Sequence, residues 1–155
     1  MRFAQAIAGF FGCGRVPVSP GSAGSLAALV IGYFLLLLPT YALTLAILAA
    51  SLGGLWAIRA ARVQGDPGWV VIDEVAGQWI ALLGLSPTSA GRPSIPGLIA
   101  AFLVFRILDI AKPGPVGWAD RQKNAAGIMA DDLIAGAFTA GIVWAAQSRW
   151  PAMFG

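Results

Sequence analysis

The sequence predicts an all-α fold, a polytopic helical membrane bundle of about five hydrophobic helices preceded by an N-terminal interfacial helix. Three observations predict it. Of the 155 residues, 58% are hydrophobic and only 11% are charged, whereas about a quarter of a soluble domain is charged. The mean hydropathy is +0.78. Apolar stretches recur along the chain, separated by polar or Gly/Pro-rich connectors. The length fits one domain, so residues 1–155 are treated as a single membrane domain.

The expected elements follow from these stretches. Residues 2–12 place Phe3, Ile7, Phe10 and Phe11 at helix-like spacing, which is typical of a helix lying in the membrane interface. No cleavable signal peptide is evident in this segment. The five apolar helices are expected over residues 25–38, 41–58, 75–85, 95–111 and 133–146. Several are shorter than the roughly 20 residues that cross a bilayer unaided, so the sequence leaves open which of them span.

The charges predict the orientation. If all five stretches span, the three long charged connectors fall on one side, which then holds Arg2, Arg15, Arg59, Arg62, Lys112, Arg121 and Lys123. Arg92 and Arg149 lie opposite. The positive-inside rule makes the basic side cytoplasmic, which predicts a multi-pass membrane protein. All seven carboxylates lie in or beside the same connectors, so the candidate site faces the cytoplasm.

Composition also excludes several kinds of chemistry and partner. The chain has no histidine, which excludes Ser-His-Asp and Cys-His catalysis, histidine phosphoenzymes and histidine zinc sites. The net charge is +3, but the basic residues are dispersed among apolar segments. They form no run that could follow a phosphate backbone, so nucleic acid is not an expected partner. The expected partner at this point is the lipid bilayer. The sequence does not determine the oligomeric state.

Asp109 is the most informative single residue, because an ionised group on an apolar helix is costly unless it is paired or bound to a metal. Arg106 and Lys112 are each three residues away, so on a helix all three side chains point to roughly the same side. This pattern favours a site for an anion together with a cation. A buried ion-pair cluster that orients the helix is the structural alternative.

Two carboxylate pairs, Asp73-Glu74 and Asp131-Asp132, each precede an apolar stretch. Taken singly, each pair fits a helix cap, because acidic side chains meet free amides and the positive end of the helix dipole. Together with Asp109 they place acidic groups at three positions on one face of a chain that is poor in charge. Hard oxygen ligands of this kind suit Mg²⁺. We therefore expect a metal site rather than coincident capping.

The segment of residues 12–25 is rich in Gly, Pro and Ser and ends at a helix start. Backbone amides in such a loop, the helix N-terminus and Arg15 could cradle a phosphate. The segment is neither a Walker loop nor a dinucleotide fingerprint, so a plain interfacial turn stays an equal alternative.

Four sequence blocks carry a family resemblance. They are Gly-Arg-Val-Pro at 14–17 running into Pro-Gly-Ser-Ala-Gly-Ser-Leu at 20–26, Val-Ile-Asp-Glu-Val-Ala-Gly at 71–77, Phe-Arg-Ile-Leu-Asp-Ile-Ala-Lys-Pro-Gly-Pro at 105–115, and Gly-Ile-Met-Ala-Asp-Asp-Leu-Ile-Ala-Gly at 127–136. With these blocks in this order, the chain resembles the bacterial phosphatidylglycerophosphatase A family. The resemblance covers most of the chain, and four separate blocks make it specific.

The resemblance implies Mg²⁺-dependent hydrolysis of the phosphomonoester of phosphatidylglycerophosphate, a membrane phospholipid, which gives phosphatidylglycerol and inorganic phosphate at the bacterial inner membrane. We expect the catalytic residues to be Asp73, Glu74, Asp109, Asp131 and Asp132. The expected Mg²⁺ ligands among them are Asp73, Glu74, Asp131 and Asp132, with Asp109 as a further candidate. Arg106, Lys112 and Arg15 are expected to bind the substrate phosphate. The sequence does not separate direct attack by water from an aspartyl-phosphate intermediate.

Two other functions stay open at this point. A CDP-alcohol phosphotransferase also uses paired aspartates and Mg²⁺ in a small helical membrane protein, but its long Asp-rich signature is absent here. A small membrane transporter or ion-pathway protein could use Arg106 and Asp109 as a relay. Against it, the charges gather at one face, and the chain shows no internal repeat of the kind many carriers have.

Overall fold

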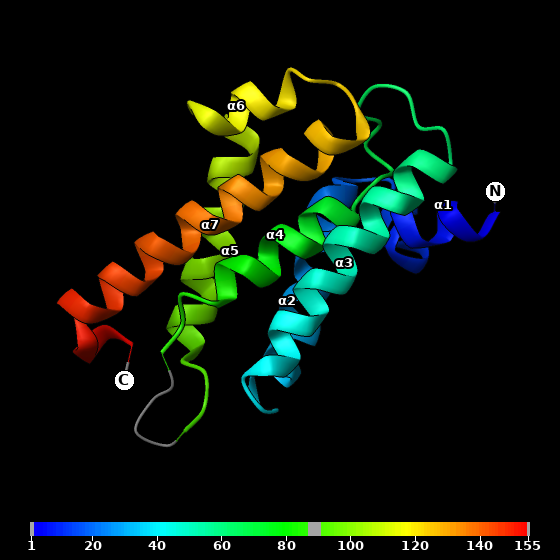
Figure 1. Cartoon of the computed structure of the whole chain (residues 1–155). Coiled ribbons are helices and arrows are strands. Elements are labelled where there is room, and N and C mark those ends of the chain that lie inside the picture. The colour runs from blue at the N-terminus through cyan, green and yellow to red at the C-terminus, as the bar shows by residue number, and fades with distance from the viewer. Residues whose placement is uncertain (1, 87–90, 155) are drawn as a thin grey trace.

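The computed structural model describes residues 2–86 and 91–154, so part of the connector that carries Arg92 lies outside the described residues. The helices are α1 (Arg2–Ala8), α2 (Pro20–Leu36), α3 (Tyr41–Ala60), α4 (Ile72–Leu82), α5 (Ile95–Ala111), α6 (Pro115–Asp120) and α7 (Ala125–Arg149), with the 3₁₀ helices η1 (Phe10–Arg15) and η2 (Pro151–Met153) (Figure 1). The described residues contain no β-strand. The all-α prediction is confirmed.

Each of the five predicted apolar stretches lies largely within one helix, but the bounds differ in places. α5 has the predicted bounds, because Ser94 caps it by accepting a hydrogen bond from the Gly97 N–H at 3.2 Å and Lys112 ends it. α2 begins at Pro20, inside the Gly-rich segment, because proline is favoured in the first turn of a helix. α7 begins at Ala125, well before the predicted residue 133. Asn124 sets this start by accepting hydrogen bonds from the Ala126 and Gly127 amides.

The expected number of membrane spans is not confirmed. Two helices, α3 and α7, are long and apolar enough to cross a membrane. α2 is apolar but shorter, and α4 has only 11 residues. At 1.5 Å per residue, an 11-residue helix is much shorter than the roughly 30 Å of a bilayer core. The coarser prediction, an all-helical protein with apolar membrane-spanning candidates, is the one the structure supports.

The N-terminal element is shorter than predicted. α1 ends at Ala8, and the chain continues as η1 with left-handed backbone at Phe10 and Phe11 (φ 42° and 53°). The side chains of Phe3 and Phe11 are 67% and 76% exposed, whereas Ile7 and Phe10 are half-buried against the bundle. Each of these two short elements therefore places one apolar side chain against the bundle and exposes the other.

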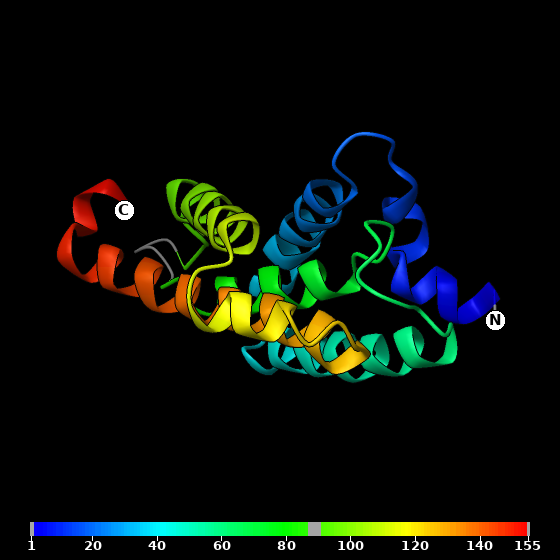
Figure 2. The same ribbon diagram turned by 90° about the horizontal axis from the view of Figure 1, so that it is seen from above.

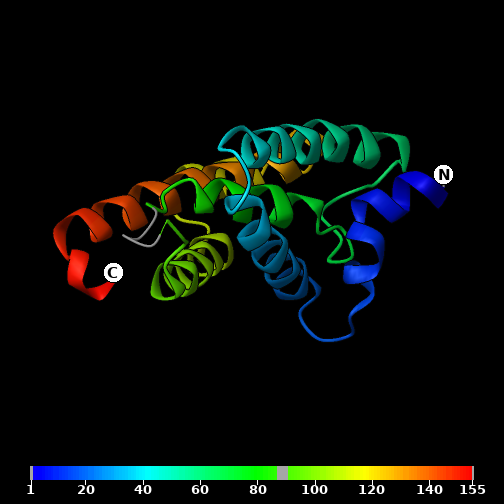
Figure 3. The same ribbon diagram turned by 90° about the horizontal axis from the view of Figure 1, so that it is seen from below.

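The centre of the bundle is α4, which packs against α2, α3, α5 and, most extensively, α7. α2 and α5 lie on one side of α4 and α3 lies on the other (Figures 2 and 3). Nine of the eleven α4 residues are buried. The Trp79 indole N–H donates to the Ala28 carbonyl at 2.8 Å and ties α4 to α2 inside the core. The helix that begins with Asp73 and Glu74 is thus the one most enclosed by its neighbours.

The outer faces of the other helices are strongly apolar. Large exposed hydrophobic side chains lie on α2, α3, α5 and α7, among them Leu26, Val30, Phe34, Leu45, Leu48, Leu52, Ile99, Leu103, Ile107, Phe138 and Ile142. An apolar exterior of this extent is unusual for a soluble monomer and is expected of a protein in contact with lipid. The exterior and the two candidate spans together support a membrane protein.

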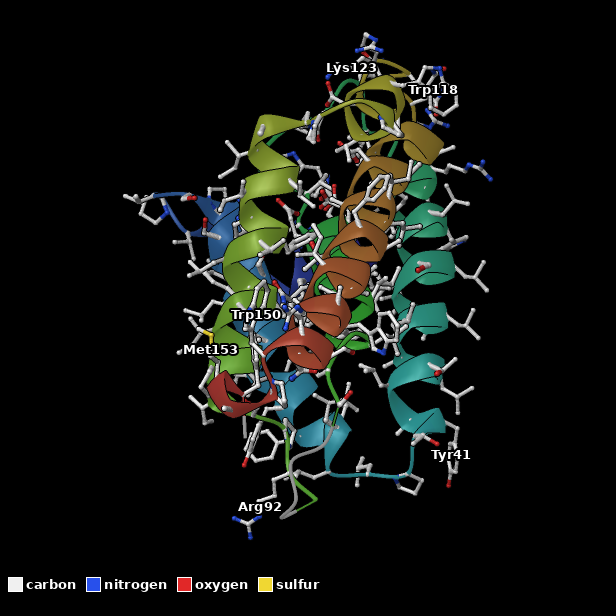
Figure 4. The ribbon with its side chains drawn as sticks, turned by 90° about the vertical axis from the view of Figure 1, so that its left-hand side faces the viewer. Tyr41, Arg92, Trp118, Lys123, Trp150 and Met153 are labelled. Atoms are coloured by element: carbon white, nitrogen blue, oxygen red, sulfur yellow. The ribbon has the colours of Figure 1, made fainter. Side chains whose placement is uncertain are left out.

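The helices alternate in direction, so the charged connectors meet at one end of the bundle. The connectors 61–71 and 112–124 and the start of α2 lie at this end, and the 37–40 turn and the C-terminus lie toward the other (Figure 1). Lys123 and Trp118 mark the charged end, and Arg92 and Tyr41 mark the opposite end (Figure 4). The predicted gathering of the three long connectors on one side is therefore confirmed.

Candidate active site

The charged end brings three of the predicted carboxylates together. Asp73 and Glu74 lie in the first turn of α4, and Asp132 lies on α7. One oxygen from each of these side chains lies within 4.8 Å of the others. Asp73 is 6% exposed and Asp132 is 2% exposed. We call these three residues the carboxylate trio.

No cationic side chain among the described residues forms a hydrogen bond or ion pair with the carboxylate trio. The Asp73 Oδ1 accepts a hydrogen bond from the Glu74 amide at 3.0 Å, but the buried Glu74 Oε2 has no hydrogen-bond partner among the described residues. Burial, reinforced by the neighbouring Glu74 charge, raises the pKa of Asp73 well above its usual value. Burial also raises the pKa of Glu74 to about 7. Both residues lie outside the candidate spans α3 and α7. Closely spaced, desolvated carboxylates are stable as anions only beside a cation.

The start of α2 closes one side of the trio. A Cβ placed on Gly21 would lie 2.2 Å from the Glu74 Oε1 and 3.4 Å from an Arg106 nitrogen. Only a glycine lets the α2 backbone approach so closely. The Gly-rich segment therefore does reach the carboxylates, at Gly21 rather than at its N-terminal part.

Arg106 and Asp109 form an ion pair on α5, as in the structural alternative to the anion and cation site that the sequence favours. The Arg106 Nη1 donates to the Asp109 Oδ2 and lies 3.4 Å from the Ser25 Oγ on α2. The Arg106 Nε is buried without a hydrogen-bond partner among the residues described. The charges of both Asp109 and Arg106 act on Glu74. The pair thus borders the trio, and part of its guanidinium is free to bind an anion.

Lys112 departs from the predicted arrangement. Pro113 disfavours helical backbone at the residue before it, and Lys112 ends α5 in left-handed conformation with φ 47°. Its side chain turns away from Asp109. The Nζ bonds to Asp120 of α6, to Asp131 at 2.9 Å, and reaches Asp66 at 3.8 Å. The prediction that Lys112 shares a face with Arg106 and Asp109 is wrong.

Asp131 also lies away from its predicted position in the metal site, and the reason is again where a helix begins or ends. Because it lies inside α7 and not at its start, Asp131 and Asp132 are consecutive helical residues whose side chains diverge by about 100°. Asp132 joins the trio, whereas Asp131 joins Asp66 and Asp120 around the Lys112 Nζ. We call this second group the lysine-filled cluster. The hydrogen bond from Lys112 lowers the pKa of Asp120. The predicted four-residue metal set is therefore divided between two groups.

Arg15 lies apart from both groups. It ends η1 and lines a cavity of about 370 Å³ together with Gln5, Gly9, Phe11 and Trp69. None of the carboxylates lines this cavity. The structure does not bring Arg15 to the trio, so its phosphate-binding role stays a prediction.

Sequence reasoning missed three features of this end of the molecule. It did not single out Asp66 and Asp120 as partners of Lys112, nor Ser25 as a neighbour of Arg106. The charges of Asp66 and Asp120 in connectors were visible signals, but their spacing from Lys112 shows no helical period. Ser25 lies within the Gly-rich segment, where nothing in the sequence points to Arg106, 81 residues away.

The chain matches known proteins over most of its length. A family model described as Phosphatidylglycerophosphatase A matches residues 6–147. Phosphatidylglycerophosphatase A of Escherichia coli (strain K12) is 38% identical over 145 residues, 91% of this chain and 81% of that protein. The protein of the same description from Haemophilus influenzae (strain ATCC 51907 / DSM 11121 / KW20 / Rd) is 35% identical, over 88% of this chain and 84% of that protein.

A further relative, described as a putative phosphatidylinositol-3-phosphatase of Bacteroides thetaiotaomicron, is 37% identical over 90% of this chain and 89% of that protein. No solved structure matches the chain. These relatives are described as phosphatases, which does not favour the transporter alternative. The resemblance that the four sequence blocks predict is confirmed, and the chain belongs to the phosphatidylglycerophosphatase A family.

Proposed function

We propose that this chain is a Mg²⁺-dependent membrane phosphatase that hydrolyses the terminal phosphomonoester of phosphatidylglycerophosphate, with its site at the cytoplasmic face of a bacterial inner membrane. Family membership assigns the chain to phosphatidylglycerophosphatases. The reaction consumes one water, breaks the bond between the terminal phosphorus and the glycerol oxygen, and releases phosphatidylglycerol and inorganic phosphate.

The observation that carries the proposal is the carboxylate trio with its unpartnered Glu74 oxygen. Two buried carboxylates and one half-buried carboxylate, with no cationic side chain bonded to them among the described residues, need a cation, and oxygen-only ligands are the donor set that Mg²⁺ prefers. The residues therefore fit the ion. Asp73, Glu74 and Asp132 would hold it, and it would supply charge neutralisation and a lowered pKa for the attacking water.

The remaining steps belong to the protein. Arg106 lies beside the trio with buried N–H groups that can bind the non-bridging phosphate oxygens. Asp109 holds the guanidinium in place through its bond to Nη1. The packing of Gly21 against Glu74 keeps bulk water away from this side of the site, which strengthens the electrostatic interactions within it.

The charge distribution supports the orientation. Lys123 lies at the charged end of the bundle and Arg92 at the opposite end (Figure 4). The connectors 61–71 and 112–124 at the charged end also contain Arg62, Lys112 and Arg121. By the positive-inside rule the charged end lies in the cytoplasm. A lipid phosphate in the cytoplasmic leaflet would then reach the trio without crossing the membrane.

The proposal is tested by phosphate release from phosphatidylglycerophosphate in detergent micelles, first with Mg²⁺ and then with EDTA. Phosphatidic acid, phosphatidylinositol 3-phosphate and a soluble phosphomonoester serve as comparison substrates. We expect release that requires Mg²⁺ and prefers phosphatidylglycerophosphate. Preference for the inositol lipid would transfer the assignment to the activity named for the Bacteroides relative. Release that is unaffected by EDTA would overturn the role of the metal.

A further inference from the structure

The buried side-chain atoms that lack a hydrogen-bond partner are not scattered through the molecule. Within residues 2–86 and 91–154 they are the Glu74 Oε2, the Arg106 Nε, and both amide atoms of Gln78. Glu74 and Arg106 already belong to the proposed site. Gln78 is 0% exposed and has no assigned role. An unpaired buried polar group costs about 1–3 kcal/mol, so a fully unpaired amide calls for a ligand that satisfies it.

Gln78 lies directly below the site. It follows Glu74 by four residues on α4, so its side chain lies on nearly the same face, about 6 Å further along the axis. α2 runs beside α4 in the same direction, with Gly24 against Val71, Ala28 bonded to Trp79 and Gly32 against Leu82. Gln78 therefore lies deeper between the helices than Ser25, the residue that follows Gly24.

Ser25 adds a polar group beside the trio. Its side chain is fully buried, donates to the Gly21 carbonyl at 2.9 Å and lies 3.4 Å from the Arg106 Nη1. The polar layer beneath the trio therefore consists of the Gln78 amide, about one helical turn beyond Glu74. Further along α4, Leu82 packs against Gly32.

The depth of this layer matches one part of the proposed substrate. With the terminal phosphate at the trio and the acyl chains in the bilayer, the head-group glycerol lies between them, one step below the phosphate. Its free hydroxyl can both donate and accept, and a carboxamide offers an acceptor and two donors. We propose that the Gln78 amide binds this head-group hydroxyl and so selects a glycerol-linked phosphomonoester over one that lacks the hydroxyl.

This inference rests on the proposed function. Because Gln78 is fully buried, neighbouring side chains move aside as the head group enters, and the contact forms in the complex. A site built to pair with a substrate hydroxyl rejects the analogue without it, since the buried amide is then left unpaired. Phosphatidic acid places its phosphate directly on the diacylglycerol and has no hydroxyl to offer to Gln78.

The test compares phosphatidylglycerophosphate with an analogue whose head group is 1,3-propanediol phosphate, which differs only in the missing hydroxyl. We expect the wild-type kcat/KM to favour the natural head group by about tenfold to a hundredfold. Gln78→Met, which keeps the length of the side chain, is expected to lose most of this preference by lowering kcat/KM on phosphatidylglycerophosphate alone. Equal values for the two substrates in the wild-type protein, or an unchanged preference in the variant, would overturn the inference.

The chain offers a matched control in Gln147, which is also buried but has a partner. Its Oε1 accepts a hydrogen bond from the Ser86 amide at 2.8 Å, and it lies near the opposite end of α7. Gln147→Met is expected to lower the melting temperature and leave the substrate preference intact. Gln78→Met is expected to hold or raise the melting temperature, because it removes an unpaired polar group from the core.

A measurement without turnover separates this inference from the proposed function. In EDTA, the wild-type protein is expected to bind phosphatidylglycerol more tightly than a phosphatidyl-1,3-propanediol of the same acyl chains, which lacks only the middle hydroxyl, and Gln78→Met is expected to bind both equally. Equal binding by the wild-type protein would overturn the Gln78 contact even if no substrate is hydrolysed. Hydrolysis of neither substrate together with selective binding would overturn the proposed phosphatase activity and leave the head-group site standing.

Discussion

The two acidic groups at the charged end have similar composition and opposite electrostatic states. In the carboxylate trio, Asp73 and Asp132 are buried, Glu74 is half-buried, and the buried Glu74 Oε2 has no hydrogen-bond partner among the described residues. The lysine-filled cluster of Asp66, Asp120 and Asp131 is more exposed, and the Lys112 Nζ bonds to its members. In the second group the chain supplies its own cation. In the first it does not, although Arg106 is near enough for its charge to act on Glu74.

The difference between the two groups indicates which of them is the candidate metal site. Three carboxylates within reach of one another are common without an ion, so proximity alone decides nothing. The informative difference is whether an internal cation already bonds to the group. Only one residue separates the two roles on α7, because Asp131 and Asp132 diverge around the helix. Four measurements would test this difference between the carboxylate trio and the lysine-filled cluster.

The largest effect is expected for loss of a trio carboxylate. Asp73→Asn and Asp132→Asn each leave the cation with fewer charged ligands, so phosphate release should fall by about a hundredfold to a thousandfold or more. Asp66→Asn, from the exposed edge of the lysine-filled cluster, is the matched control and should stay within a few fold of wild type. Near-normal hydrolysis by both trio variants, with protein that inserts and folds normally, would remove the trio from the reaction.

Removing the internal cation should destabilise the second group. Lys112→Met leaves Asp120 and Asp131 facing each other without neutralisation. The site is partly exposed, so the expected loss of unfolding free energy is about 1–3 kcal/mol, between the values for exposed and buried pairs. Thermal unfolding in detergent measures the loss. Added Ca²⁺ or Mg²⁺ should restore part of it in the variant, because the vacated cluster becomes a cation site. A variant as stable as wild type and indifferent to cations would show that Lys112 does not hold the cluster together.

Metal addition should stabilise the wild-type protein through the trio alone. At a Mg²⁺ concentration of about one hundred times the dissociation constant, binding to the folded state adds about 2.7 kcal/mol. The melting temperature should therefore rise on adding Mg²⁺ and fall again with EDTA. Glu74→Gln should lose most of this shift, and Asp120→Asn should keep it. A shift retained in Glu74→Gln and lost in Asp120→Asn would place the ion in the other group.

The smallest effect is expected for Lys123, which also contacts Asp120. Its Nζ lies 3.1 Å from the Asp120 Oδ1, but its side chain is 53% exposed. Exposed pairs of this kind contribute about 0–1 kcal/mol. Lys123→Met should therefore change the melting temperature far less than Lys112→Met does. Similar losses in the two variants would mean that both lysines share the neutralisation of the cluster.

Much of this arrangement follows from the sequence. The five apolar stretches predict five helices, and the charge distribution predicts that the carboxylates meet at one end. The helix bounds at the site do not follow, because α7 begins at Ala125, where Asn124 caps it, and so includes Asp131 and Asp132 together with the residues before them. One shifted boundary changes which way Asp131 points.

The contacts of Lys112 also could not be predicted from residue spacing along the sequence. Spacing of three residues predicts a shared face only while the helix continues, and Pro113 ends it at the decisive position. Its partners on α6 and α7 and in the 61–71 connector come together only through the tertiary fold. Whether the Gln78 amide has a hydrogen-bond partner likewise depends on its tertiary neighbours, which the hydrophobic pattern of the sequence does not identify.

At three points the backbone of α7 lies directly against the backbone of α4 or of the residues just after it. A Cβ on Gly77 would lie 2.5 Å from the Asp132 carbonyl, one on Gly136 would lie 2.3 Å from the Gly77 carbonyl, and one on Gly84 would lie 2.2 Å from the Ala140 carbonyl. Larger side chains at these glycines would force the two segments apart. Asp73 and Asp132 belong to these two segments, so the small size of the glycines holds the two carboxylates within reach of each other, whichever apolar side chains cover the outer faces of the bundle.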